Sequence, residues 1–453
     1  MPSTKPRRAI VIGAGMGGLA AAGALASHFA HVTVLERDVL AGEAAPRKGT
    51  PQCRQPHALL AGGLQALCEI FPGFDDDLAR AGAAPVRQNL DIRLEQPGRD
   101  FMPRRDLGLP LSYFMTRPLL ELTLRRRVQA LGHVEIRSRA EVLGLVAGEA
   151  GEGVVGVRFD GGGGEETLAG DLVIDASGRG EPTLAFLEAA GFAPPEEQVV
   201  QMGLGYASVV LSPPRRGDDW LAAITMPEAP ADRYGMFLLP IEGGRWMATI
   251  DSMNDAELPE DWPAFLARAK ALRTPTLYEA IKDCAPLSEV ARFRRQRSVL
   301  RHFERLADFP GGLIAFGDAV CQFNPIHGQG MSVAAQQAVA LNRLLAERDG
   351  SARSLEGLGK AFFDAALSVI ETPWSWSTSF DFRFPATLGE RPPGFEARAS
   401  FNAALTELAA RDPATQRLLV EVANCMKPNA AFAQPALVQA VLTIMNEAEG
   451  EPA

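Results

Sequence analysis

The chain has 453 residues, 47% of them hydrophobic and 22% charged, which is typical of a globular protein with room for more than one domain. Its formal net charge of −10 at pH 7 disfavours a nucleic-acid partner. Its five cysteines are scattered, which argues against a disulfide framework or a zinc site and favours a reducing, cytoplasmic location. Beyond the N-terminal apolar run, no stretch predicts a membrane span.

The N-terminal segment carries the first motif. The apolar run Ala9 to Ile12 is followed by Gly13-Ala14-Gly15-Met16-Gly17-Gly18, an alanine-rich stretch and a second apolar run that ends at Glu36. This order predicts the strand, glycine turn, helix and strand of a dinucleotide-binding βαβ unit. Gly13 permits the tight turn, Gly15 lets backbone approach a pyrophosphate, and Gly18 lets the helix lie close to the sheet. The helix N-terminus would face the phosphates and Glu36 the ribose.

The same segment could be a secretory signal peptide. Lys5, Arg7 and Arg8 precede an uncharged stretch from Ala9 to Ala26. Cleavage would discard the glycine motif, and the strand, helix and Glu36 occur in the expected order. The nucleotide-binding interpretation is therefore favoured.

Two further segments carry candidate ligands. The loop from Ala41 to Pro56 contains Arg47 and Lys48, and a loop this long within a domain is more often functional than not. Pro118 can open a helix, which places Arg117 at its start. A cation is unfavourable to the helix dipole there, so a ligand role is favoured for Arg117.

The middle of the chain changes character. Strands are predicted at 133–136, 140–148, 154–160 and 166–174, and alternating strands within 181–289 predict a separate, mostly antiparallel sheet backed by helices. Five arginines at 292–301 form a basic cluster before the next apolar strand, either a solvated face or a docking patch for an acidic redox partner. From residue 351 the chain is predicted to be helical, apart from an aromatic-rich linker at 373–385.

The second motif follows an apolar strand at Leu313 to Phe316. It consists of Gly317-Asp318, then Pro325 and Gly328-Gln329-Gly330-Met331, with a helix beginning at Ser332. Here the chain resembles the flavin monooxygenases of the p-hydroxybenzoate-hydroxylase fold, whose second fingerprint is a strand ending in Gly-Asp, then a proline and a Gly-x-Gly-x that opens a helix. The resemblance implies that Asp318 accepts a hydrogen bond from the FAD ribityl chain. The N–H groups after Gly328 and Gly330 would face the flavin pyrimidine ring.

The resemblance is nearest to one branch of that fold. Arg-Lys-Gly-x-Pro-Gln at 47–52 and Asn-Pro-Ile-x-Gly-Gln-Gly-Met at 324–331 look like the FAD-dependent epoxidases of polyether biosynthesis, and more distantly like squalene epoxidases. The implied fold is α/β: a Rossmann-like FAD-binding domain, an inserted, mostly antiparallel β-sheet substrate domain and C-terminal helices. Its boundaries would be 1–90, 103–182 and 292–350 for the FAD-binding domain, 91–102 and 183–291 for the substrate domain, and 351–453 for the helical region.

The resemblance also implies a set of cofactor contacts. It implies no catalytic side chain and no metal, because the flavin carries the difficult chemistry. His327 would lie near the flavin ring, in a packing or hydrogen-bonding role. The implied FAD contacts are Gly13, Ala14, Gly15, Met16, Gly17, Gly18, Glu36, Arg37, Arg47, Lys48, Arg117, Val142, Gly317, Asp318, Pro325, Gly328, Gly330 and Met331.

The activity implied by the resemblance is that of an FAD-dependent monooxygenase. In such enzymes reduced flavin captures O2 as a C4a-hydroperoxide and delivers one oxygen atom, here by epoxidation or hydroxylation of a largely apolar, natural-product-like substrate. NAD(P)H would supply electrons directly or through a flavin reductase. The chain has Ser177-Gly178 where aromatic hydroxylases of the fold have Asp-Gly, and Cys321 where they have histidine, which favours a separate reductase.

Three alternatives stay open. A flavin-dependent halogenase would carry a relay lysine and a Trp-x-Trp-x-Ile-Pro signature. This chain has no lysine between Lys48 and Lys270, and its Trp374-Ser375-Trp376 lies beyond the second motif and lacks Ile-Pro. A reductase or dehydrogenase fits both fingerprints equally well. A non-catalytic flavin carrier is opposed only by the apparent substrate domain.

Overall fold

A five-stranded parallel sheet carries the strands of both motifs. The computed structural model describes residues 7–98, 102–149, 153–214, 219–348 and 355–450. Within them the sheet has the order β17-β11-β1-β2-β7, and all its neighbouring strands run parallel. Its strands are β1 (Arg8–Ile12), β2 (His31–Glu36), β7 (Val134–Ser138), β11 (Leu172–Asp175) and β17 (Leu313–Ala315). The predicted βαβ unit is therefore present, and the strand of the second motif lies two places from β1.

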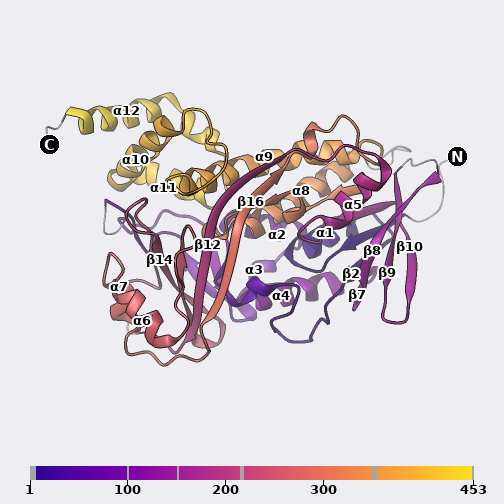
Figure 1. Ribbon diagram of the computed structural model, residues 1–453, viewed down its shortest axis with the longest axis horizontal. Helices are drawn as coiled ribbons and strands as arrows, with labels where there is room; N and C mark the ends of the chain where they lie inside the picture. Colours follow the sequence, from indigo (N-terminus) through magenta and orange to yellow (C-terminus); the bar gives the residue numbers. More distant parts are fainter. Residues whose placement is uncertain (1–6, 99–101, 150–152, 215–218, 349–354, 451–453) are drawn as a thin grey trace.

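Helices cover one face of this sheet and a β-meander covers the other (Figure 1). The glycine- and alanine-rich α1 is almost completely buried, because its small side chains let it lie close to both the sheet and α8. The helices on this side are α1 (Met16–Ala26), α2 (Ala61–Ile70), α3 (Phe74–Arg80), α4 (Arg117–Gln129) and α8 (Gly330–Glu347). The meander consists of β8 (Glu141–Ala147), β9 (Val154–Asp160) and β10 (Glu165–Ala169), and α5 (Glu181–Ala190) follows β11.

A seven-stranded, mostly antiparallel sheet forms the second large sheet of the protein. Its order is β18-β16-β12-β15-β14-β13-β5, and every pair is antiparallel except β13 with β5. The helices α6 (Trp262–Lys270) and α7 (Thr276–Ile281) pack on one face through an apolar cluster. The strands are β5 (Ile92–Glu95), β12 (Glu197–Leu211), β13 (Ala222–Thr225), β14 (Tyr234–Ile241), β15 (Arg245–Ser252), β16 (Ala291–Arg301) and β18 (Cys321–Gln322).

A small antiparallel sheet connects the two larger ones. It contains β3 (His57–Leu59), β6 (Leu111–Met115) and β4 (Ala84–Arg87) in that order. Its side chains join those of the seven-stranded sheet in a shared apolar cluster, on the face opposite to α6 and α7. The predicted α/β fold with an added antiparallel sheet and C-terminal helices is confirmed. The exact domain boundaries stay a prediction.

The basic cluster precedes the apolar strand β17, as expected, and is itself part of the strand β16. Its arginines belong to β16, and alternate side chains face solvent there. Arg292 forms an ion pair with Glu260, and Arg294 lies 3.5 Å from Asp255. Arg292, Arg294 and Arg297 are exposed and form a solvated face, whereas Arg301 is buried and pairs with Glu197 at 2.8 Å.

The expected linker at 373–385 is wrong over most of its length. The helix α9 (Leu358–Asp381) continues through Pro373, although proline removes a helical hydrogen bond. Trp374 and Phe380 are buried on the same helix, and burial of large aromatic side chains offsets the loss. The chain then forms α10 (Phe395–Arg411), α11 (Pro413–Ala423) and α12 (Pro435–Gly450), which lie beside the end of the seven-stranded sheet (Figure 1).

Among the helices of the described ranges, none combines the length and the apolar character needed to cross a membrane.

Substitutions in the glycine turn test how closely α1 must approach the sheet. A Cβ atom at Gly18 would lie 1.9 Å from the carbonyl oxygen of Gly13, whereas one at Gly17 would lie 3.6 Å from the Cβ of Ala334. We expect Gly18→Ala to lower the free energy of unfolding by about 1–3 kcal/mol, because backbone must move to admit the methyl group. The matched variant Gly17→Ala should change it by less than about 1 kcal/mol. Urea unfolding of both variants measures this, and equal effects would contradict the close approach.

Candidate functional site

The turn of the first motif needs glycine for two reasons. Gly13 has a φ of +98°, a conformation that other residues rarely adopt, and its N–H donates to the Leu35 carbonyl at 2.8 Å. A Cβ atom there would also lie 2.7 Å from the Ala176 carbonyl oxygen. The chain therefore passes through a narrow gap between β2 and the loop after β11 before α1 begins.

Glu36 supports this turn from the end of β2. Its side chain is buried, one carboxylate oxygen accepts the Ala14 N–H at 2.8 Å, and the other accepts the Asp38 N–H at 2.9 Å. The residue predicted as a ribose ligand thus also holds the glycine turn in place. A carboxylate with two oxygens can do both, because each oxygen has more than one lone pair.

Arg47 lies at the centre of a cluster of ion pairs. Its guanidinium lies 3.2 Å from Glu36, 2.9 Å from Asp38 and 3.2 Å from Glu121. Arg117 joins the same cluster through Glu121, at 2.7 Å. The structure therefore brings together three of the predicted cofactor residues, although they come from β2, a loop and α4.

Glu121 is a member of this cluster that we did not predict. Burial opposes its ionisation, but Arg117 and Arg47 together hold the pKa of its carboxyl below the ordinary value. In sequence it is the fourth residue after Arg117 on a helix, and this spacing puts both side chains on one face. The sequence signal for Glu121 was its spacing from Arg117. That spacing indicates a role in the cluster only when Arg47 is known to lie beside Glu121.

The space before α1 suits a pyrophosphate. A Cβ atom at Gly15 would have, as its nearest neighbours, the Nη2 atoms of Arg117 at 3.7 Å and Arg47 at 3.8 Å. Free backbone N–H groups at the N-terminus of α1 and two guanidinium groups thus surround one gap. The residues present fit the diphosphate of a dinucleotide such as FAD.

Three predicted contacts lie outside this cluster. Arg37 and Lys48 are exposed, and Val142 lies in β8 opposite Phe159. The described contacts do not bring them to the pyrophosphate gap. Their roles as cofactor ligands stay predictions.

The second motif lies beside the first in space. Gly317 has a φ of +64° and donates its N–H to Gln337 of α8 at 2.8 Å. A Cβ atom at Gly330 would lie 3.9 Å from Asp318 Oδ1, which puts that carboxylate at the N-terminus of α8. Gly17 of α1 packs against Ala334 of α8. The two helix N-termini are thus neighbours, as one cofactor spanning both motifs requires.

The loop between Asp318 and α8 is held by a buried pair that we did not predict. Asn324 and Asp381 are both fully buried, and the Asn324 amide donates to the Asp381 carboxylate. The Asn324 carbonyl oxygen accepts the Ile326 N–H at 3.0 Å, at the start of the short helix Pro325–His327. The other Asp381 oxygen has no partner among the described residues. Burial raises the pKa of Asp381 to about 7.

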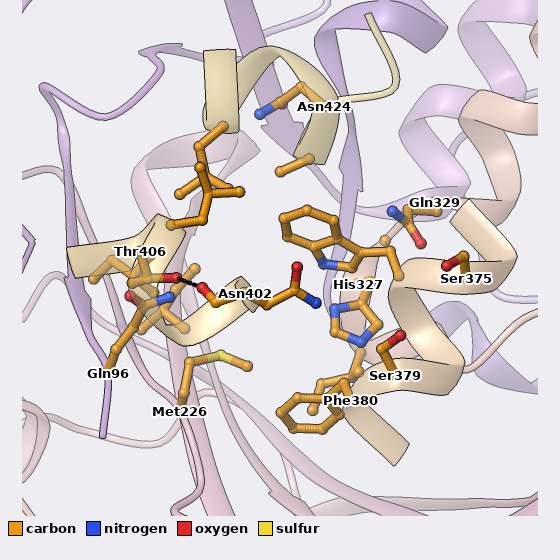
Figure 2. Close-up of a pocket in the computed structure, with 18 of the residues that line it drawn as sticks. Gln96, Met226, His327, Gln329, Ser375, Ser379, Phe380, Asn402, Thr406 and Asn424 are labelled. Atoms are coloured by element: carbon orange, nitrogen blue, oxygen red, sulfur yellow. Dashed lines mark hydrogen bonds between the residues drawn. The ribbon is translucent and has the colours of Figure 1, made fainter. Parts of the chain in front are cut away.

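A large cavity lies on the far side of that short helix. Its volume is about 890 Å³, and the segment from Pro325 to Gln329 forms part of its wall. Figure 2 shows Thr406 of α10 with Gln96 and Met226 on the side of the cavity away from His327, and Asn402 of α10 extending from there toward His327. The small antiparallel sheet, the seven-stranded sheet and the C-terminal helices all contribute to its wall. Many of the lining side chains are apolar, among them Phe114, Ile224, Phe237, Leu239, Trp376, Phe380, Phe401 and Phe432.

Two histidines near this region are neutral. Burial lowers the pKa of His327 to about 4, and its ring lies edge-on to Phe380 with 5.1 Å between centroids. Burial and the charge of Arg117 lower the pKa of His57 to about 4 as well. At pH 7 both imidazole rings are therefore uncharged, and neither can act as a cationic general acid.

The Ser177-Gly178 loop forms a hydrogen bond with the seven-stranded sheet. The Gln322 side chain of β18 donates to the Gly178 carbonyl at 3.1 Å, and Cys321 beside it is buried. The substitutions noted in the sequence therefore lie next to each other, between the two large sheets.

Comparison with known proteins decides the family. Residues 7–356 match the family described as FAD binding domain. The chain belongs to the FAD binding domain family. The pyrophosphate gap and the paired helix N-termini of this FAD-binding protein agree with that membership. FAD as cofactor is thereby confirmed.

One relative in sequence and two similar solved structures, whose named activities differ, illustrate the likeness. Protein Rv3254 of Mycobacterium tuberculosis is 35% identical over 359 residues, which are 76% of this chain and 74% of that protein. The flavin-dependent brominase Bmp2 has a TM-score of 0.69 at 14% identity, covering 97% of this chain and 98% of its own. The p-nitrophenol 4-monooxygenase PnpA from Pseudomonas putida has a TM-score of 0.62 at 16% identity, covering 93% and 99%. At such identities these structures show the fold alone.

Removal of the central cation of the ion-pair cluster should be costly. Arg47→Met would leave Glu36, Asp38 and Glu121 close together without their shared partner. We expect the free energy of unfolding to fall by about 3 kcal/mol and FAD affinity to fall with it. The matched variant Lys48→Met, at an exposed neighbour, should leave stability unchanged. Urea unfolding and FAD titration measure both, and a stable Arg47→Met protein with normal FAD affinity would refute the role of the cluster.

Asp381 should give the protein a specific pH dependence. Its pKa is about 7 in the folded chain, against the ordinary value of 3.8. Between these values the folded chain holds a proton that the unfolded chain releases, so this group's contribution to stability is complete below pH 3.8 and is lost as pH rises to about 7. In Asp381→Asn, which can still accept from Asn324, this loss of up to about 1.4 kcal/mol per pH unit should be absent. Unfolding curves from pH 4 to 8 that run parallel for the two proteins would contradict this.

Proposed function

We propose that this protein is an FAD-dependent monooxygenase that inserts one atom of O2 into a largely apolar substrate. The observation that carries the proposal is the position of the cavity. The segment Pro325–Gln329, which connects Asp318 to the N-terminus of α8, is also part of the cavity wall. A molecule bound in the cavity would therefore lie next to the flavin half of the FAD site.

The cavity walls suit oxygen transfer to an apolar molecule. Bound FAD, once reduced, supplies the activation of dioxygen. The protein must then exclude water and hold the acceptor carbon in place, and apolar side chains from β13, β14, α9 and α10 can do both. A cavity of about 890 Å³ accommodates a polycyclic or long-chain compound.

The polar groups of the wall can orient the substrate without acid–base work. His327 is neutral at pH 7 and can exchange a hydrogen bond with a substrate hydroxyl or carbonyl group. Asn402, which Figure 2 shows extending across the cavity toward His327, can do the same. Epoxidation and hydroxylation both fit such a wall, and likeness to the polyether-type epoxidases supports the former.

The electron source is also proposed. NAD(P)H would reduce the flavin directly or through a separate flavin reductase. The Ser177-Gly178 loop, which departs from the Asp-Gly pair of self-sufficient aromatic hydroxylases, supports the reductase. Consumption of NAD(P)H by the purified protein, with and without an added flavin reductase, distinguishes the two sources.

Bromination is a second candidate, supported by the structural likeness to Bmp2. Halogenases use a lysine to relay hypohalite, and no lysine is among the described residues that line this cavity. Oxygen insertion therefore has the stronger support. A brominated product in bromide-containing buffer would reverse that order.

Isotopic oxygen tests the proposal directly. The FAD-loaded protein, supplied with NADH and a flavin reductase under ¹⁸O2, should convert members of a panel of apolar alkenes and electron-rich aromatics to products that carry one ¹⁸O atom. Trp376→Ala, which alters the cavity wall, should change the product profile, whereas Trp262→Ala on α6 should not. Desaturated products without label would instead identify a dehydrogenase of the same fold.

A further inference from the structure

Two arginines are among the residues that line the cavity near one end of α9. Arg383 lies two residues beyond the last residue of α9, and Arg398 lies in the first turns of α10. The two segments meet through Phe382 and Phe395, whose rings pack edge to face with 6.1 Å between centroids. The cavity therefore has one cationic region, formed where α9 and α10 come together.

Arg383 has no counter-charge within the part of the chain that the structure describes. No ion pair joins it to an acid, and burial among uncharged groups lowers the pKa of its guanidinium. Arg383 is nevertheless exposed, and it lines the cavity. Because no acid of the described residues pairs with its guanidinium, the N–H groups can donate to an anionic ligand in the cavity.

Arg398 is also available to a ligand. Its guanidinium donates to the carbonyl of Pro393 and forms no ion pair within the described residues. Arg391, in contrast, is occupied outside the cavity, where it lies over the rings of Phe382 and Phe395 and 3.7 Å from Glu396.

The acidic content of the cavity wall is low. Glu407 is the one acid among the described lining residues, and it is paired with Arg411 at 3.0 Å. It lies on α10 next to Thr406, which Figure 2 shows on the side of the cavity that holds Gln96 and Met226. Within the part of the chain that the structure describes, no acid forms an ion pair with Arg383 or Arg398.

We propose that the substrate is an apolar molecule with one anionic group, a carboxylate, that binds Arg383 and Arg398. Its apolar body would extend from there along Phe380 and Trp376 toward His327, on the flavin side of the cavity. This inference rests on the proposed function for the identity of the ligand as substrate. Arginine pairs with carboxylate through two parallel hydrogen bonds, so it would also fix the orientation of the body and hence the carbon that reacts.

Binding of a simple amphiphile tests the cationic region. Isothermal titration of the FAD-loaded protein with decanoate and with decan-1-ol compares an anion with a neutral molecule of the same chain length. We expect decanoate to bind about tenfold or more tightly than decan-1-ol, because hydrogen bonds to charged groups exceed neutral ones in strength. Equal affinities for the two would overturn the proposal.

Variants assign the preference to the two arginines. Arg383→Gln and Arg398→Gln should each reduce the preference for decanoate several-fold, while leaving the affinity for decan-1-ol unchanged. Arg383→Lys should retain most of the preference for decanoate. This variant also keeps the proposal testable if Arg383→Gln does not fold. Arg391→Gln, outside the cavity, should keep the full preference. If it lost as much preference as Arg383→Gln, the effect would be structural and the proposal would be wrong.

The phosphates of NADPH are the other anionic candidates for the same arginines. If NADPH displaced decanoate competitively, or if Arg383→Gln slowed flavin reduction by NADPH without changing decanoate binding, the region would serve the reductant and the proposal would fail. The titrations with decanoate and decan-1-ol need neither reductant nor turnover. Their outcome is therefore independent of the ¹⁸O experiment, and failure of either inference can be recognised separately.

Discussion

Arg47 connects the parts of the chain on which the nucleotide site depends. One guanidinium contacts carboxylates at the end of β2, in the loop that follows it and on α4. Without the cation these acids would repel one another, and Glu36 would no longer be held where it accepts the Ala14 N–H. The cluster thus links the glycine turn at the start of α1, through Glu36, to Arg117, through Glu121. A charged cluster that is only partly buried can act in this way because each of its members is paired.

The close approach of α1 and α8 is the second constraint, because it joins two motifs from opposite ends of the FAD-binding region. Small residues permit this approach, since Gly17 of α1 packs against Ala334 of α8, and Gly63 lets α2 come close to Ser332 of α8. Two helix N-termini that lie side by side can bind the phosphates and the flavin ring of one cofactor. Larger side chains at these positions would separate the helices and divide the site.

The buried pair of Asn324 and Asp381 connects the cofactor to the cavity. It fixes the start of the Pro325–His327 turn to the end of α9, which is the helix that supplies Trp376 and Phe380 to the cavity wall. A change in how α9 packs would therefore move the Pro325–His327 turn on the flavin side of the site. A substrate that fills the cavity and the FAD that binds behind its wall thus share one structural support.

The sequence by itself determined the two cofactor-binding motifs of this protein, because their signals are local. The turn at Gly13 to Gly18, the acid at Glu36 and the Gly317-Asp318 pair each depend on backbone geometry within a few residues, and that geometry restricts which residues can stand there. The continuation of α9 through Pro373, the placing of the arginine cluster within β16, and the roles of Glu121 and Asp381 were decided only by the tertiary structure. Each depends on partners brought together from distant segments, as Glu121 with Arg47 and Asp381 with Asn324. The cavity is the extreme case, since its wall comes from two sheets and from the helices α9 to α12, which share no local pattern.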